Sequence, residues 1–204
     1  MRHRRRGRTL GRNPAHQRAL LRNLASSLFL TERNAEDEEN APKVKGRIIT
    51  TLEKAKEVRP LVERCITLAR HSLSATEAAQ EHASTAERNT DAWRSWRKSE
   101  QWKRWNHAIA PAVKARRRAL QLLGDKQAVR ILFGDVAPRF ADRPGGYTRI
   151  MRLAKPRLGD AGTRAILEFV GVRDRVTQRA QRPAFETEEG KPAKPAKAAK
   201  STKS

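Results

Sequence analysis

An excess of positive charge constrains this chain more than any other feature of its sequence. Its 204 residues include 45 Lys and Arg against 22 Asp and Glu, which leaves a formal net charge of +23. Repulsion among so many like charges opposes compaction and favours a polyanionic partner. Apolar residues make up 37% of the chain. That fraction allows one core of modest size, built from roughly 100–150 residues, with basic segments outside it.

Composition and missing signals exclude several protein classes. The single cysteine, Cys65, cannot form an internal disulfide or a thiolate zinc site, and its apolar helical surroundings indicate a core thiol. No run approaches the roughly 18 apolar residues that span a bilayer. The N-terminus lacks the apolar stretch of a secretory signal and, before Leu10, the amphipathic helix of a mitochondrial presequence. We therefore expect a cytoplasmic protein that needs no metal or other cofactor.

The two ends of the chain are both basic, but in different ways. Residues 1–12 contain six arginines and no acidic residue, and Gly7 and Gly11 keep the backbone adaptable. Arginine grips phosphate with a planar fork of two hydrogen bonds, so this segment is predicted to be a nucleic-acid-binding arm rather than a solubilising tail. Residues 176–204 lack apolar periodicity, repeat a Lys-Pro-Ala unit over residues 191–197, and are predicted to be disordered.

Between these ends, residues 13–175 carry the patterns of one folded domain. Asn as N-cap and Pro at the first helical position predict a helix over residues 13–30. Residues 34–46 contain an acidic run with proline and glycine and are predicted to be a loop. The β-branched residues of 47–50 predict a short strand.

A second helix is predicted to start at a capping box formed by Thr50 and Glu53. Pro60 lies in its interior and is expected to kink or break it, at a cost of about 3 kcal/mol if nothing compensates. The apolar side of this helix consists of Leu52, Ala55, Val62, Ile66 and Ala69.

All four tryptophans fall in residues 74–118, a polar, alanine-rich stretch of helical composition. They form two pairs, Trp93 with Trp96 and Trp102 with Trp105, which do not share one stripe of a continuous helix. Either each pair faces a different surface, or the helix breaks near Ser99. Stacking on RNA bases and packing between helices or on a protein neighbour both remain open, and packing is favoured.

The remaining segments complete the predicted fold. Asp125 is the N-cap of a helix that Pro138 ends. Residues 147–154 and 163–170 are predicted strands joined by a glycine-rich connection, and they form an antiparallel hairpin. The order of the elements is a helix, a strand, further helices and a closing hairpin. This order predicts an α+β fold, a two-layer helix-on-sheet domain with a helical insertion. The buried face of the helix after Asp125 consists of Val129, Leu132, Phe133 and Val136.

The loop before this hairpin is a second candidate site for nucleic acid. Arg139, Arg143 and Arg149 surround it. Gly145 and Gly146 let the backbone approach a phosphate closely, and the adjacent tyrosine is suited to stack on an exposed base. It is an equally good interpretation that the loop is an ordinary turn and that this tyrosine, Tyr147, packs in the core.

The sequence offers no catalytic constellation. The five histidines are scattered, none lies in a metal-binding His-x-x-x-His pattern, and no glycine-rich phosphate loop is present. The acidic residues gather in the predicted loop and in the tail, where solvent exposure is their usual role. We therefore expect a protein that is not an enzyme.

Three blocks of residues follow one another in a recognisable order. The first contains Arg2-His3-Arg4, Gly7-Arg8-x-Leu10-x-Arg12, His16 and Arg22-Asn23. The second is Ile49-Thr50-Thr51-Leu52-x-Lys54-Ala55-Lys56-Glu57. The third contains Leu132-Phe133, Pro138-Arg139-Phe140, Arg143 and Gly145-Gly146-Tyr147-Thr148-Arg149-Ile150. Together they resemble the bacterial large-subunit ribosomal protein seventeen family, and three ordered blocks are far more specific than one.

This resemblance implies a compact α+β domain and a structural, non-catalytic protein of the large ribosomal subunit. In the family, the protein binds large-subunit ribosomal RNA on the solvent side near the peptide exit region, beside other ribosomal proteins. Arg5 and Arg6 add charge to the arm, and Arg18 shares a helix face with Arg22. The residues carried over as RNA-facing are Arg2, His3, Arg4, Arg8, Arg12, His16, Arg22, Asn23, Lys54, Lys56 and the loop from Arg139 to Arg149. The alternative function is that of a free DNA-binding protein that compacts nucleic acid.

The chain also departs from the family pattern. Residues 34–46 look like an acidic insertion, and residues 74–116 look like a much larger one that holds every tryptophan. Pro60 stands where the family usually continues an unbroken helix, and the tail beyond about residue 175 is extra. We expect the 74–116 insertion to form a helical extension that lies on neighbouring RNA or protein.

Overall fold

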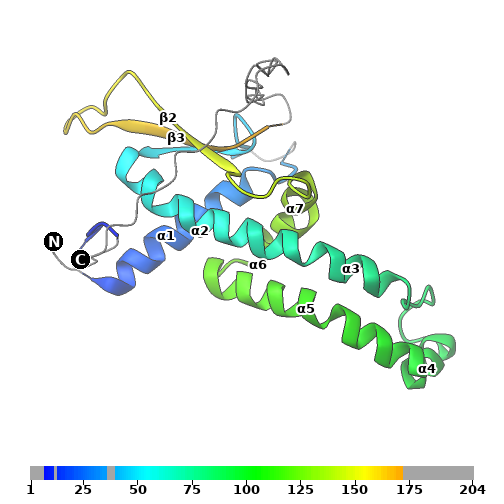
Figure 1. The fold of residues 1–204 in the computed structure, drawn as a ribbon. Coiled ribbons are helices and arrows are strands. Elements are labelled where there is room, and N and C mark those ends of the chain that lie inside the picture. The colour runs from blue at the N-terminus through cyan, green and yellow to red at the C-terminus, as the bar shows by residue number, and fades with distance from the viewer. Residues whose placement is uncertain (1–6, 12, 36–39, 172–204) are drawn as a thin grey trace, which may run out of the picture. The chain divides into compact units, whose positions relative to one another are not determined.

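The computed structural model describes residues 7–11, 13–35 and 40–171 (Figure 1). It combines helices with one antiparallel sheet, which confirms the predicted α+β class. The elements are α1 (Pro14–Leu30), β1 (Arg47–Thr51), α2 (Leu52–His71), α3 (Leu73–Gln80), α4 (Asp91–Lys98), α5 (Glu100–Leu123), α6 (Lys126–Ile131), the π-helical turn η1 (Leu132–Val136), α7 (Ala137–Arg139), β2 (Thr148–Arg152) and β3 (Arg164–Phe169). The arm residues Arg2, His3, Arg4, Arg5, Arg6 and Arg12, the acidic run 36–39 and the tail lie outside the described residues.

The sheet has β3 at its centre, antiparallel to β1 on one side and to β2 on the other. The pairing of β2 with β3 confirms the predicted hairpin. Side chains alternate between the two faces of a strand, so Ala165, Leu167 and Phe169 of β3 all enter the core. The opposite face carries Glu168, with Arg47 and Arg149 as its cross-strand neighbours.

Helix α2 is the central helix of the domain and packs between the sheet and α5, with α1 alongside (Figure 1). Its predicted apolar side is buried, and Val58 and Cys65 are buried with it. Burial raises the pKa of the Cys65 thiol to about 12, which confirms a core thiol rather than a reactive one. Among the described helices, none is long and apolar enough to cross a membrane.

The predicted capping box at the start of α2 is wrong. Thr50 belongs to β1, where it pairs with Ala165, and the helix is preceded by Thr51 without a side-chain cap. The backbone N–H of Leu52 instead donates to the carbonyl of Thr163 at 3.0 Å. The residue just before β3 therefore accepts from the first helical N–H, which needs no side-chain cap.

Pro60 does not break α2, which continues as one helix from Leu52 to His71. A proline removes the hydrogen bond to the carbonyl four residues earlier, here that of Lys56. Pro60 and Lys56 are both exposed, so water can solvate the carbonyl that loses its partner. The predicted break is therefore absent.

Asp125 caps α6 as predicted, its carboxylate accepting from the backbone N–H of Gln127 at 2.7 Å. The predicted end at Pro138 is wrong, because the helical turns continue through Pro138 to Arg139. In the wider turn η1, the N–H of Ala137 bonds the carbonyl of Leu132. Pro138 then stands in the first turn of a new helix, where its missing N–H costs little.

The stretch 74–118, predicted to be helical, is helical except for a loop over residues 81–90 and a break at Ser99. Helix α4 lies at the far end of α5 from the sheet (Figure 1). The break between α4 and α5 falls at Ser99, which is extended with φ −80° and ψ 165°. Across this break the Trp96 and Trp105 rings pack edge to face at 5.7 Å. The Arg97 guanidinium lies 5.1 Å from the Trp93 ring and 5.9 Å from that of Trp102. The tryptophans therefore pack α4 onto α5.

Candidate nucleic-acid interface

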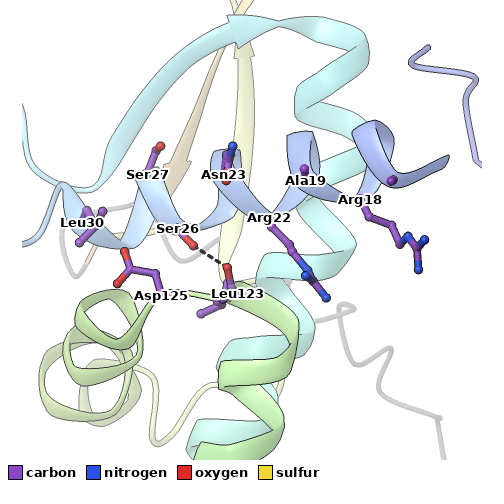
Figure 2. Close-up of a pocket in the computed structure, with 11 residues that line it drawn as sticks. Arg18, Ala19, Arg22, Asn23, Ser26, Ser27, Leu30, Leu123 and Asp125 are labelled. Atoms are coloured by element: carbon purple, nitrogen blue, oxygen red, sulfur yellow. Dashed lines mark hydrogen bonds between the residues drawn. The ribbon is translucent and has the colours of Figure 1, made fainter. Parts of the chain in front are cut away.

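A hollow of about 610 Å³ lies between α1 and the turn that joins α5 to α6 (Figure 2). It brings together three residues predicted to face RNA, namely Arg18, Arg22 and Asn23. Its other lining residues are Ala15, Ala19, Ser26, Ser27, Leu30, Leu123, Gly124 and Asp125.

The sequence of α1 places these arginines on its outer side. The Asn13 side chain accepts from the backbone N–H of Ala15 at 2.8 Å, so the helix starts where predicted. One side of α1 is buried through Ala25, Leu28 and Phe29. Arg18 and Arg22 are four residues apart, which puts both on the exposed side.

Both arginines bond only to backbone carbonyls among the described residues. Arg22 donates from Nη2 to the carbonyl of Gln121 at 3.0 Å, and Arg18 donates from Nε to the carbonyl of Pro14 at 3.4 Å. Neither has a carboxylate partner in the part of the chain that the structure describes. Figure 2 shows the two side chains pointing to the same side, away from Asp125. Their charge is therefore not neutralised by a neighbouring acid.

A buried hydrogen bond fixes the floor of the hollow. The Ser26 hydroxyl donates to the carbonyl of Leu123 at 3.2 Å and so ties α1 to the end of α5 (Figure 2). Gly124 ends α5 with φ 78°, a backbone conformation that glycine adopts without strain. Sequence reasoning missed Ser26, because a serine inside a helix carries no signal that separates a structural hydrogen bond from simple exposure.

Besides Arg8, which lies 3.5 Å from Glu57, two arginines predicted to face RNA pair with acidic residues of the fold. Arg139 donates to both carboxylate oxygens of Glu32, each at 2.9 Å, and this hydrogen bonding raises the pKa of Arg139. Arg149 donates to Glu168, whose other oxygen lies 3.3 Å from Arg47. Glu168 is only 3% exposed. These arginines therefore neutralise carboxylates within the fold.

The Gly-Gly-Tyr loop divides into a buried part and an exposed part. Tyr147 is 1% exposed, and its ring lies 5.2 Å from that of Phe140. Base stacking by Tyr147 is thus incompatible with this fold, and core packing is the correct alternative. Gly145 and Gly146 remain exposed, and Arg143, also exposed, donates to the carbonyl of Gly145 at 3.3 Å.

The described end of the arm lies against the second block. Arg8 is 3.5 Å from Glu57 of α2, so residues 7–11 approach the helix that carries Lys54 and Lys56. Lys56 is exposed and Lys54 half-buried, and His16 is exposed on α1. The fold therefore places the described end of the first block close to the second block.

Sequence reasoning missed one basic cluster, Lys114, Arg116, Arg117 and Arg118 of α5. Four basic side chains within five residues, in a helix with no acidic residue after Glu100, were the signal that could have identified it. Arg118 donates to the side-chain oxygen of Gln121 at 3.0 Å. This cluster therefore adjoins the residue whose carbonyl accepts from Arg22.

Comparisons with known proteins identify the family of the chain. The family model described as ribosomal protein L17 matches residues 20–170. A protein of Rhodopirellula baltica named large ribosomal subunit protein bL17 is 69% identical over 186 residues, which cover 91% of this chain and 89% of that protein. Proteins of the same name from Thermomicrobium roseum and Nitratidesulfovibrio vulgaris are 38% and 36% identical, each over 83% of this chain and over 99% and 87% of their own lengths. The chain belongs to the ribosomal protein L17 family.

Proposed function

We propose that this protein binds large-subunit ribosomal RNA through the outer face of α1 and thereby supports assembly of the subunit. As a member of the L17 family, it is a structural protein of the large subunit of bacterial ribosomes in the cytoplasm, and it is not an enzyme. Ribosomal RNA and neighbouring ribosomal proteins are its partners. The finer assignment, which residues meet the RNA, rests on the geometry of the folded chain.

The observation that carries the proposal is the pair of arginines on α1. Arg18 and Arg22 are exposed, point to one side, and have no acidic partner among the described residues. Two guanidinium groups held this way repel each other, and a phosphate backbone removes that repulsion while using their hydrogen-bond donors. Asn23 adds a neutral donor and acceptor at the rim of the same hollow.

Neighbouring segments extend this surface. The arm of residues 1–12 leads into α1, and its described part lies beside α2, where Lys56 is exposed. The predicted contribution of Arg2, His3, Arg4, Arg5, Arg6 and Arg12 stays part of the proposal. The loop at Gly145 and Gly146 contributes an exposed backbone and Arg143, without a stacking tyrosine.

A binding measurement tests the proposal directly. Wild-type protein is titrated with bacterial large-subunit ribosomal RNA and with duplex DNA of equal length, over a series of salt concentrations. Preference for the RNA supports the proposal, whereas equal affinity favours the alternative of a free DNA-compacting protein. In intact cells the protein should co-sediment with large subunits, and finding it only in the soluble fraction would contradict the proposal.

A double variant locates the contact. Arg18→Gln with Arg22→Gln should lower the slope of log affinity against log salt by about 1.5, since each lost phosphate contact contributes roughly 0.7–0.9. The matched control is Arg94→Gln with Arg157→Gln, which removes two exposed arginines already paired with Asp91 and Asp160. Equal slopes for the two double variants would show that only total charge matters.

A further inference from the structure

We propose that the outward face of α5 is a second RNA-binding surface, which takes the sugar–phosphate backbone of folded RNA. The surface consists of Lys114, Arg117 and Arg118, all of them exposed. It extends the RNA interface from α1 into the segment that carries the tryptophans. The inference rests on the proposed function, because it assigns a further part of the same protein to the same kind of partner.

The balance of charge changes along this segment. Residues 73–100 hold five acidic residues and four Lys or Arg, whereas residues 101–123 hold six Lys or Arg and no Asp or Glu. Within α5 the ion pair that the structure contains joins Lys103 to Glu100 at 3.0 Å, in the first turn. The middle and end of the helix therefore present unneutralised positive charge, the electrostatic feature of a nucleic-acid contact.

Helical spacing gathers this charge on one face. Arg117 and Arg118 follow Lys114 by three and four residues, so the three side chains are neighbours on the helix surface. Like charges at this spacing destabilise a helix, and no acid on α5 offsets them. The opposite face is buried through Ala112, Ala119 and Leu123. The three basic side chains therefore point away from the core.

Arg116 shows by contrast what a structural arginine does in this cluster. Its guanidinium lies 5.3 Å from the Phe133 ring, so it packs over the helical turns that follow α6. Lys114 and Arg117 have no such partner among the described residues. Arg116 thus packs against the fold, whereas the other basic residues of this run point outward.

The α5 surface joins the α1 surface through Gln121. Arg22 of α1 donates to the Gln121 carbonyl, and Arg118 of α5 donates to its side-chain oxygen, both at 3.0 Å. Gln121 therefore brings Arg22 of α1 and Arg118 of α5 together, so the two basic surfaces adjoin at the end of α5.

The composition of the face favours RNA over a protein partner. Val113 is the one large apolar side chain of α5 that is exposed, at 37%. Protein interfaces depend on buried aromatic or apolar anchors, and the tryptophans of this segment pack against one another and Arg97 instead. Val113 and Ile109 line a hollow on this face, and Lys114, Arg117 and Arg118 line the same hollow. The larger exposed side chains of the face are therefore basic, which fits a phosphate backbone.

The test removes the charge and keeps the helix. The full-length variant Lys114→Gln/Arg117→Gln/Arg118→Gln is compared with Arg88→Gln/Arg94→Gln/Lys98→Gln, which removes three positive charges near α4. Binding to bacterial large-subunit ribosomal RNA is measured against salt, with circular dichroism as a check of helix content. The α5 variant should lower the salt slope by about 2, from three contacts at roughly 0.7–0.9 each, and the control should change it far less.

Footprinting separates this surface from the α1 face. Hydroxyl-radical protection should disappear at one RNA site for the α5 variant and at an adjoining site for Arg18→Gln/Arg22→Gln. Equal slopes for the α5 variant and wild type, or equal losses in both triple variants, would overturn the inference. So would unchanged RNA binding with failed incorporation into subunits, because the face would then contact a protein. Failure of the proposed function looks different, since the wild type itself would not prefer the RNA.

Discussion

The arginines of α1 and those beside the sheet have the same chemistry and opposite surroundings. Arg18 and Arg22 stand on an exposed helix face and bond to carbonyls. Arg139 and Arg149 reach carboxylates that are themselves almost buried, Glu32 at 8% and Glu168 at 4% side-chain exposure. A guanidinium committed to a carboxylate stabilises the fold, whereas an uncommitted one weakens it slightly and remains available to a phosphate.

The comparison teaches that basic residues within one family pattern need not share one role. Each of the four arginines was predicted to face RNA, and only the pair on α1 is free of an acidic partner among the described residues. Substitutions should therefore separate two phenotypes, loss of stability on the sheet side and loss of RNA affinity on the α1 side.

Glu168→Ala should cause the largest loss. It leaves Arg47 and Arg149 facing each other across β3 without the carboxylate between them, and the free energy of unfolding should fall by about 2 kcal/mol. Urea denaturation monitored by circular dichroism measures this. The control is Asp160→Ala, which removes the partner of Arg157 on an exposed turn and should leave the urea midpoint unchanged. A similar loss of unfolding free energy in the two variants would show that the buried ion pair stabilises the fold no more than the exposed one.

Glu32→Ala should lower the free energy of unfolding by about 1 kcal/mol, since it removes a two-pronged bond from a partly exposed arginine. A double-mutant cycle with Arg139→Ala measures the coupling, expected at about 0.5–1.5 kcal/mol. Arg139→Gln should leave the salt dependence of RNA binding near that of wild type. A drop in that slope as large as the one for an α1 arginine would move Arg139 to the RNA-binding group.

Arg18→Gln/Arg22→Gln should give the reverse pattern. Because the two side chains are exposed and pair with no acid in the described ranges, the free energy of unfolding should change by less than about 0.5 kcal/mol. RNA binding should nevertheless weaken and become less sensitive to salt. The same urea titration and binding assay check both halves, and a clearly destabilised variant would mean that these arginines support the fold.

Tyr147→Phe should have the smallest effect. The Tyr147 hydroxyl is buried and has no hydrogen-bond partner in the described structure, so its removal leaves no group unsatisfied. The free energy of unfolding should stay nearly the same, and RNA affinity should not change. RNA binding weakened about tenfold would instead show that the tyrosine leaves the core on binding.

Local sequence patterns correctly predicted those features of the fold that depend on residues within one helix. Asn13 and Asp125 cap the helices that they precede, and the apolar side of α2 is buried as expected. The predictions that fail concern residues whose environment is set by a partner far away in the sequence. Thr50 is held by its strand partner Ala165, and Tyr147 is enclosed by Phe140, so neither follows its local signal.

The candidate site was predictable in part. Spacing along α1 placed Arg18 and Arg22 on one exposed face, and the ordered blocks identified Asn23 with them. The hollow itself depends on Ser26 meeting the carbonyl of Leu123, ninety-seven positions away in the chain. No periodicity within α1 could indicate that contact, because its partner lies on another helix.

The sequence by itself determined the sign of the charge, the order of the elements and the family to which the chain belongs. These depend on composition and on spacings of a few residues, which one segment carries alone. Only the tertiary structure decided which positive charges are neutralised, because Glu32 and Arg139 are 107 positions apart and meet through folding. Charge is a property of each residue, whereas neutralisation is a property of a pair in space.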